Sequence, residues 1–582
     1  MRARYPDRDG YVERDGVKVF YEAFGVGEPT VLLLPTWSII HSRHWKDQIP
    51  YLARHFRVVT FDGRGNGRSD RPSDAAAYSD TEFVADAIDV LDATGTDRAV
   101  IAGVSMGSGY ALRLAAEHPD RVLGAVFVGP SVGLSDPIPD RITYPFDEVL
   151  PTDEGWAKYN EHYWRRDWGG FAEFFFSQVF TEPHSTKPIE DCVGWALETD
   201  ADTILTAERA PYLEAPAGHR RRLRPFTLDL ARQVRCPCLV IHGSGDAISH
   251  VSGGIRLAES VAGDLAVLEG SGHCPQVRDP VAVNLLMRDF VRRVAPERRR
   301  PSTRSWTRAR VRPPKALYLS SPIGLGHALR DVAIAEELRR LHPGLQIDWL
   351  AQHPVTKVLE ARDERVHPAS AWLANESEHI EAESAEHDLH AFQAIRRMDE
   401  ILIANFMVLH DVLESEPYDL VVGDESWDVD HFLHENPELK RTRFVWMTDF
   451  VGWLPMPDGG EREAFLTADY NAEMIGQVER YPRIRDRAIF VGDPDDIVPD
   501  AFGPDLPSIR EWTESHYDFA GYVTGFDPAA LSDTGAIRGE LGYRPDEKVC
   551  IVTVGGSGVG GSLLRRVIAA YPQAKREVPA LR

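Results

Sequence analysis

The stretch Arg98-Ala-Val-Ile-Ala-Gly-Val-Ser-Met-Gly107 decides the fold of the first half of the chain. Residues 98–104 are almost entirely apolar, which is typical of a strand buried on both faces of a parallel sheet. A helical pattern follows from about residue 106 to residue 117. Between them, Ser105 stands in a G-x-S-x-G arrangement, which predicts a sharp strand-to-helix turn that holds its hydroxyl clear of the sheet.

Two later loops supply candidate partners for this serine, which is a weak nucleophile on its own. Asp246 and His273 each come shortly after an apolar strand, at residues 238–242 and 265–268. Parallel sheets place their sites at the carboxyl ends of strands, so we expect both side chains near Ser105. The order Ser105, Asp246, His273 predicts an acyl-transfer triad, in which His273 takes the serine proton and Asp246 orients the imidazole.

The segment of about residues 10–295 resembles the α/β-hydrolase fold family. Strands at 18–34 and 57–61, the triad order, the sequence Phe61-Asp-Gly-Arg-Gly-Asn-Gly-Arg-Ser-Asp70 and the pair Asp279-Pro280 carry the resemblance. It implies a serine hydrolase, esterase- or lipase-like, that needs no cofactor and acts through an acyl-enzyme. The same triad would serve a cofactor-free haloperoxidase or a C–C bond hydrolase. The serine at the elbow disfavours the relatives with an Asp nucleophile, the epoxide hydrolases and dehalogenases.

The resemblance also implies an oxyanion hole and a cap. The hole would use the main-chain N–H of Met106 and a second N–H from the loop after Leu34. That loop reads Pro35-Thr-Trp-Ser38 and lacks the usual His-Gly pair of the family. The resemblance therefore implies Thr36 or Trp37 as the second donor. Residues of about 132–232 are rich in aromatic side chains and fall where this family inserts a helical cap. Some of these aromatics should line an apolar pocket, which favours a small-molecule substrate with an apolar acyl group.

The second half contains two segments in which a strand is followed by a glycine-rich loop and then by a helix. The first is the strand 315–320 followed by Ser321-Pro-Ile-Gly-Leu-Gly-His327, and the second is the strand 548–554 followed by a glycine loop and a helix at 562–570. Further strands at 347–350, 419–422 and 444–447 predict a doubly wound sheet. Such loops suit anionic or polar ligands at helix N-termini, although a lone G-x-G is a weak signal.

Residues of about 314–572 resemble the two Rossmann-like halves of a GT-B glycosyltransferase. The resemblance implies a nucleotide-sugar donor and an acceptor-deprotonating base at His327, assisted by Asp424. It places the donor diphosphate at Gly555, Gly556, Ser557 and Gly558. The alternative is two unrelated glycine loops in a generic nucleotide-binding α/β domain.

The chain is accordingly expected to contain a hydrolase domain at 1–295, a basic proline-rich linker at 296–314, a Rossmann-like domain at 315–545 and part of a second one at 546–582. So few residues follow the strand at 548–554 that we expect a truncated or inactive transferase. A bifunctional hydrolase–glycosyltransferase and a sugar-nucleotide-binding scaffold remain the alternatives.

Composition narrows the class of protein. A net charge of −25 argues against non-specific nucleic-acid binding, and 43% hydrophobic residues is ordinary for a folded protein. The five scattered cysteines argue against a disulfide scaffold. Together with the lack of an apolar signal sequence or membrane-spanning segment, they predict a cytoplasmic protein. The acidic, histidine-bearing stretch 376–390 predicts a solvated helix, and we expect no metal site. The oligomeric state is left open.

Overall fold

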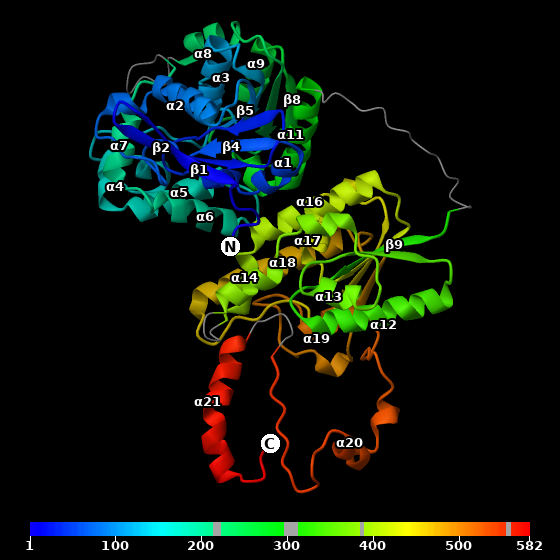
Figure 1. Cartoon of the computed structure of the whole chain (residues 1–582). Helices are drawn as coiled ribbons and strands as arrows, with labels where there is room; N and C mark the ends of the chain where they lie inside the picture. Colours follow the sequence, from blue (N-terminus) through cyan, green and yellow to red (C-terminus); the bar gives the residue numbers. More distant parts are fainter. Residues whose placement is uncertain (214–222, 296–311, 385–388, 555–559) are drawn as a thin grey trace. The chain divides into compact units, whose positions relative to one another are not determined.

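The computed structural model describes residues 1–213, 223–295, 312–384, 389–554 and 560–582 (Figure 1). The chain divides into two compact units, Arg4–Thr303 and Arg304–Arg582, the latter with Met1–Ala3. Most of the predicted linker, residues 296–311, lies outside the described residues, as do Gly555, Gly556, Ser557 and Gly558. Within the described ranges, no helix is long and apolar enough to cross a membrane.

The first unit is built on an eight-stranded sheet with the order β1-β2-β4-β3-β5-β6-β7-β8. The strands are β1 (Arg8–Arg14), β2 (Val17–Phe24), β3 (Thr30–Leu33), β4 (Arg57–Phe61), β5 (Ala99–Val104), β6 (Val122–Val128), β7 (Cys238–Gly243) and β8 (Asp264–Leu268). From β4 to β8 all pairs are parallel, as expected.

One edge of this sheet departs from the predicted parallel arrangement. β1 pairs antiparallel with β2, and β2 pairs antiparallel with β4. Asp15 and Gly16 join β1 to β2 with φ of +52° and +77°. A two-residue turn with both φ values positive twists in the sense of a hairpin, so the strands that it joins must run in opposite directions.

Helices cover both faces of the sheet. In Figure 1, α2 (Asp80–Ala93), α3 (Gly107–Glu117), α8 (Leu223–Ala231) and α9 (Ser252–Ser260) lie on one face, and α1 (Ile49–His55) and α11 (Pro280–Val294) on the other. Strands β3 to β7 are buried on both sides, which is why they read as unbroken apolar runs, whereas the edge strands β1 and β8 are partly exposed. The predicted cap lies between β6 and β7 and holds α4 (Glu161–Arg166), α5 (Trp168–Val179), α6 (Thr186–Ala196) and α7 (Ala201–Glu208).

The second unit contains a parallel six-stranded sheet with the order β10-β9-β11-β12-β13-β14. Its strands are β9 (Lys315–Ser320), β10 (Gln346–Leu350), β11 (Leu420–Asp424), β12 (Arg443–Thr448), β13 (Arg487–Phe490) and β14 (Asp518–Phe519). The chain moves from β9 to β10 on one side and then to β11 on the other. The two loops therefore diverge between β9 and β11, the position where such sheets bind ligands.

Helices alternate with these strands as the sequence predicted. Between the strands lie α12 (Leu325–Leu341), α13 (Val355–Glu360), α14 (Glu376–Glu383), α15 (Ala391–Arg396), α16 (Asp399–Ser415), α17 (Trp427–Glu435), α18 (Gly460–Arg480) and α19 (Ile509–His516). Two more helices, α20 (Thr534–Glu540) and α21 (Gly561–Glu577), follow the last strand. In the first unit, the short α10 (Pro275–Arg278) precedes α11.

Two expectations for the second half were wrong in part. Residues 548–554 do not form a strand, because among the described residues Lys548 has only an isolated bridge, to Leu581, and a strand requires a continuous ladder. The stretch 376–390 begins as the expected helix, α14, but that helix is not solvated all round. Glu376, Ser377, His379 and Ile380 are buried, which places a carboxyl group inside the unit.

Gly103 tests the tight packing of the strand-to-helix turn. A Cβ at this position would lie 2.1 Å from the Gly107 carbonyl oxygen, so Gly103→Ala must displace main chain. We expect it to lower the free energy of unfolding by at least about 1–3 kcal/mol, as measured by urea denaturation. The control Gly194→Ala, in α6, meets no atom within 4 Å and should leave stability unchanged or slightly higher. Equal stability of the two variants would contradict this packing.

Candidate active site

Ser105 occupies the turn between β5 and α3 with a left-handed main chain, φ +54°. A non-glycine residue with this φ is strained by roughly 1–3 kcal/mol and persists only where its neighbours enforce it. Gly107 provides one such constraint, since a Cβ there would lie 2.3 Å from the carbonyl oxygen of Pro35. The loop after β3 is therefore pressed against the start of α3, beside the serine.

The structure brings the three predicted triad residues together. His273 Nε2 lies 2.9 Å from Ser105 Oγ, and His273 Nδ1 lies 2.7 Å from Asp246 Oδ2. With the serine hydroxyl donating to Nε2, the ring carries its proton on Nδ1 and donates to the carboxylate. Asp246 and His273 are both buried, while Ser105 is partly accessible. This geometry allows a proton to pass from the serine to the ring.

Asp246 is held as a carboxylate by four donors. Its Oδ1 accepts the main-chain N–H groups of Ile248 and Ser249, each at 2.8 Å. Its Oδ2 is shared by His273 and a second ring, His242, whose Nε2 lies 3.0 Å away. Burial opposes the charge, but the two imidazoles outweigh it and hold the pKa of Asp246 below its ordinary value. Sequence reasoning missed His242, although it is the penultimate residue of β7 and lies only four residues before Asp246.

The predicted oxyanion-hole residues border the same turn. Met106 directly precedes α3, and the Thr36 hydroxyl donates to the carbonyl of Val104 at 2.8 Å. In the part of the chain that the structure describes, the main-chain N–H groups of Met106, Thr36 and Trp37 reach no main-chain carbonyl. All three N–H groups therefore lack a main-chain acceptor in the described chain.

The Trp37 side chain belongs to the aromatic core of the cap. Its ring centroid lies 5.3 Å from that of Phe175 and 5.9 Å from that of Trp164. Tyr159 and Phe171 complete the cluster around Trp37. The loop beside Ser105 is consequently fixed by the cap above it as well as by the sheet below it.

A short segment at the end of α5 fastens the cap to both loops of the triad. The Val179 carbonyl accepts the N–H of His273 at 2.9 Å, and Glu182 accepts the N–H of Gly272 at 2.6 Å. The Thr181 hydroxyl donates to the carbonyl of Gly245, next to Asp246, at 3.2 Å. Sequence reasoning did not find these positioning residues, because their contacts join segments that are 64 residues apart or more.

The predicted pair in the second unit is also formed. His327, in the first turn of α12, places Nδ1 3.0 Å from Asp424 Oδ2 at the end of β11. Arg330 lies against both residues and makes a further ion pair with Asp449. Burial disfavours the charged ring, but the Asp424 carboxylate outweighs it and raises the pKa of His327. The ring is therefore held at the carboxyl edge of the sheet with Nδ1 toward the acid.

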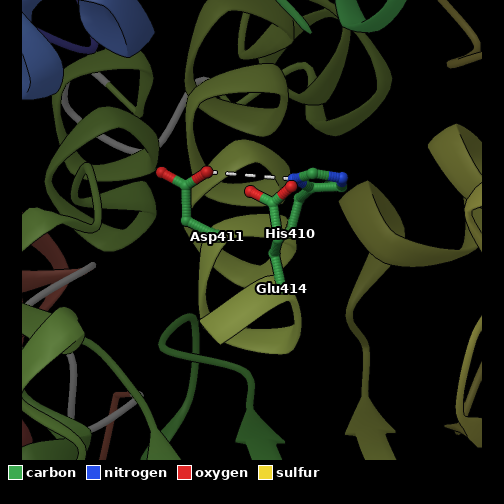
Figure 2. A group of neighbouring side chains, drawn as sticks. All are labelled: His410, Asp411 and Glu414. Atoms are coloured by element: carbon green, nitrogen blue, oxygen red, sulfur yellow. Dashed lines mark ion pairs between the residues drawn. The ribbon is translucent and has the colours of Figure 1, made fainter. Parts of the chain in front are cut away.

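One side-chain group could hold a cation, where the sequence predicted no metal site. His410, Asp411 and Glu414 on α16 form the one such group that the described residues contain (Figure 2). Asp411 and Glu414 both interact with other groups as well, and all three residues come from a single helix. Among the described residues no fourth His, Cys, Asp or Glu joins the group, and structural metal sites in proteins usually have at least four ligands.

Comparison with known proteins identifies the first unit. Residues 29–280 match the model of the alpha/beta hydrolase fold family. This segment is an alpha/beta hydrolase fold. The chain is 27% identical over 283 residues to a 2-hydroxymuconate semialdehyde hydrolase of Pseudomonas sp. (strain CF600), covering 47% of this chain and 91% of the relative.

Two further relatives have different names. A putative carbamate hydrolase, RutD, of Caulobacter sp. (strain K31) is 29% identical over 255 residues, 42% of this chain and 85% of the relative. A putative non-heme chloroperoxidase of Synechocystis sp. (strain ATCC 27184 / PCC 6803 / Kazusa) is 27% identical over 288 residues, 47% of this chain and 95% of the relative. The hydrolase fold is thus common to relatives whose names indicate different reactions.

Glu182 allows a test of the contact between the cap and the histidine loop. Glu182→Ala removes the acceptor of the Gly272 N–H, so His273 should lose part of its alignment with Ser105. We expect labelling of Ser105 by a fluorophosphonate to slow by about tenfold or more, because misplacing a catalytic group by an ångström is costly. Glu173→Ala, an exposed cap residue on α5, is the matched control and should label at the normal rate. Normal labelling of Glu182→Ala would show that the contact does not position the base.

Proposed function

We propose that the first unit is a serine hydrolase that cleaves an ester or related acyl compound. The observation that carries this proposal is the continuous hydrogen-bond chain from Ser105 through His273 to Asp246. A buried, ionised carboxylate behind the imidazole favours the imidazolium that forms when the serine gives up its proton. Hydrolysis needs no cofactor in this scheme.

The reaction follows from these positions. Ser105 Oγ attacks the acyl carbon while its proton passes to His273 Nε2, and the oxygen of the tetrahedral intermediate faces the N–H of Met106 and that of Thr36 or Trp37. The C–O bond then breaks, and the leaving alcohol takes the proton from Nε2. Water, deprotonated by His273, releases the acid from the acyl-enzyme and restores the serine.

The cap supports an apolar acyl group as the substrate class. The loop that would contribute the second oxyanion donor carries Trp37, whose ring packs against Phe175 and Trp164 of the cap. The relatives named as a semialdehyde hydrolase and a chloroperoxidase keep two alternatives open, C–C bond hydrolysis and cofactor-free halogenation. Profiling with esters, vinylogous diketones, and halide plus peroxide separates the three.

Replacing the proposed nucleophile is the direct test. Ser105→Ala should lower kcat/KM on a panel of p-nitrophenyl esters by about ten-thousand-fold or more, because alanine has no hydroxyl with which to form the acyl-enzyme. Ser177→Ala, an exposed serine of the cap, is the control and should retain full activity. Unchanged hydrolysis by a folded Ser105→Ala protein would refute the proposal.

For the second unit we propose a glycosyltransferase-like module that binds a nucleotide sugar. The pairing of His327 with Asp424 supports a base for a sugar acceptor, since the carboxylate would stabilise the ring after it takes a proton. Both residues lie at the carboxyl edge of a doubly wound sheet, next to the divergence of β9 and β11. A scaffold that binds the nucleotide sugar without turnover is the alternative.

Calorimetry with UDP- and TDP-sugars, followed by a product assay, distinguishes these two roles. The raised pKa of His327 keeps the ring protonated to higher pH, so a base at this position becomes competent only as the pH rises. Transfer should therefore increase toward alkaline pH and fall by about a hundredfold or more in His327→Ala. Binding without transfer at any pH would support the scaffold, and an absence of binding would refute both.

A further inference from the structure

His242 is a second imidazole on the acid of the triad, and the proposed mechanism gives it no role. It lies near the carboxyl end of β7, is fully buried, and places Nε2 3.0 Å from Asp246 Oδ2. The same nitrogen lies 2.8 Å from the main-chain carbonyl oxygen of Ser249. Because a carboxylate and a carbonyl are both acceptors, Nε2 must be the donor. The ring therefore carries its proton on Nε2, directed toward both oxygens.

The other side of the ring supports the same tautomer. His242 Nδ1 is buried and, among the described residues, has no hydrogen-bond partner. A Cβ on Gly254 would lie 2.3 Å from Nδ1, so the main chain of α9 closes this side of the ring. A proton on Nδ1 would be buried without an acceptor, which is unfavourable in a protein interior. The arrangement thus favours a single N–H, and that N–H faces the loop of Asp246.

The donors around Asp246 occupy every acceptor position of its carboxylate. A carboxylate offers about four lone-pair positions, two on each oxygen. Oδ1 accepts the main-chain N–H groups of Ile248 and Ser249. Oδ2 faces the N–H of His273 and that of His242. His242 thus fills the fourth position, and no lone pair is left to take the proton that His273 carries during the reaction.

Sharing of Oδ2 also limits how strongly Asp246 acts on the catalytic base. A donor that stabilises a carboxylate lowers its basicity, and in a buried site such hydrogen bonds are little weakened by solvent. The two rings share one oxygen, with His273 Nδ1 at 2.7 Å and His242 Nε2 at 3.0 Å. The second ring therefore reduces the stabilisation that Asp246 gives to the imidazolium of His273.

Other titratable and charged groups border the two loops of the triad. Cys274 follows His273, and burial raises the pKa of its thiol, so that the thiol stays uncharged. Helix α9 presents Gly254, which carries no charge, to the ring of His242. Four further groups bind partners other than the Asp246 carboxylate, and they are Glu182, Asp279, Arg141 and His250.

We propose that His242 is a positioning residue of the triad, whose Nε2–H completes the set of donors on Asp246 and thereby sets the pH at which His273 becomes an effective base. The proposal rests on the proposed hydrolase and adds a residue that sets its pH dependence. A buried histidine that only fastened the loop through the Ser249 carbonyl would stabilise the fold and leave that pH unchanged.

Two variants of the full chain that lack the donor test this role. His242→Phe keeps a ring and removes the N–H, and the shorter amide of His242→Asn does not reach Asp246. In both, the less stabilised carboxylate should favour the imidazolium of His273 more strongly. The midpoint of the acidic limb in the pH profile of fluorophosphonate labelling at Ser105 should therefore move to higher pH by about half a unit or more.

Two further variants separate the donor from a structural effect. The amide nitrogen of His242→Gln lies as many bonds from Cβ as Nε2 does, so this variant should return the midpoint to the parent value. His250→Gln replaces a histidine of the same loop whose ring contacts Ser252, and it is the matched control. Its midpoint should equal that of the parent. Thermal unfolding shows whether each variant is folded.

NMR titration of the His273 ring makes the test independent of turnover. Its signal is assigned by its loss in His273→Gln, and its midpoint should move upward in His242→Phe and His242→Asn. An unchanged or lowered midpoint in these folded variants, or a failure of His242→Gln to restore it, would overturn the proposal. A parent chain that neither reacts with fluorophosphonate nor cleaves esters would refute the hydrolase, while the ring titration would still decide the role of His242.

Discussion

The left-handed main chain at Ser105 is the constraint on which the first unit depends. A residue with φ of +54° directly after a buried strand turns the chain by the shortest route into α3 and leaves its side chain above the edge of the sheet. Such a turn has no room for side chains at Gly103 and Gly107. The loop of Pro35 and the cluster around Trp37 then close over it. The turn at Ser105, the loop after β3 and the aromatic cluster of the cap are thus packed against one another.

The part of the fold and of the site that could be predicted from the sequence was the part set by contacts between residues close together in the chain. The strand 57–61 was predicted to the residue, and the proximity of Ser105, Asp246 and His273 was predicted because each of them follows its own apolar strand. Local pattern could not reveal His242 as a second ring on Asp246, or the hydrogen bond from Gly272 to Glu182. These contacts depend on which loops, distant in the sequence, come together in the fold. Neither the period of hydrophobic residues nor the spacing of motifs predicts that.

The partial errors have the same physical origin. The segment 548–554 has the apolar, β-branched composition of a strand, but a strand exists only through its neighbours, and the described chain offers it the bridge of Lys548 alone. The residues around Glu376 have the composition of a solvated helix. Glu376 nevertheless lies buried, because Gln352 and Asn405 donate hydrogen bonds to its carboxyl group. Composition indicates which secondary structure and which degree of burial a segment can adopt. Its contacts with segments that are distant in the sequence decide which of these it adopts in the fold.

The attachment of the cap at Val179 and Glu182 has a consequence for how this fold diversifies. Because the cap holds the loop of His273 through Val179 and Glu182, exchanging the cap would also remove contacts that position His273 beside Ser105. A cap grafted from another hydrolase would have to reproduce a carbonyl and a carboxylate at the end of its corresponding helix. Single changes among the aromatic residues around Trp37 would therefore disturb these contacts less than replacement of the whole insert.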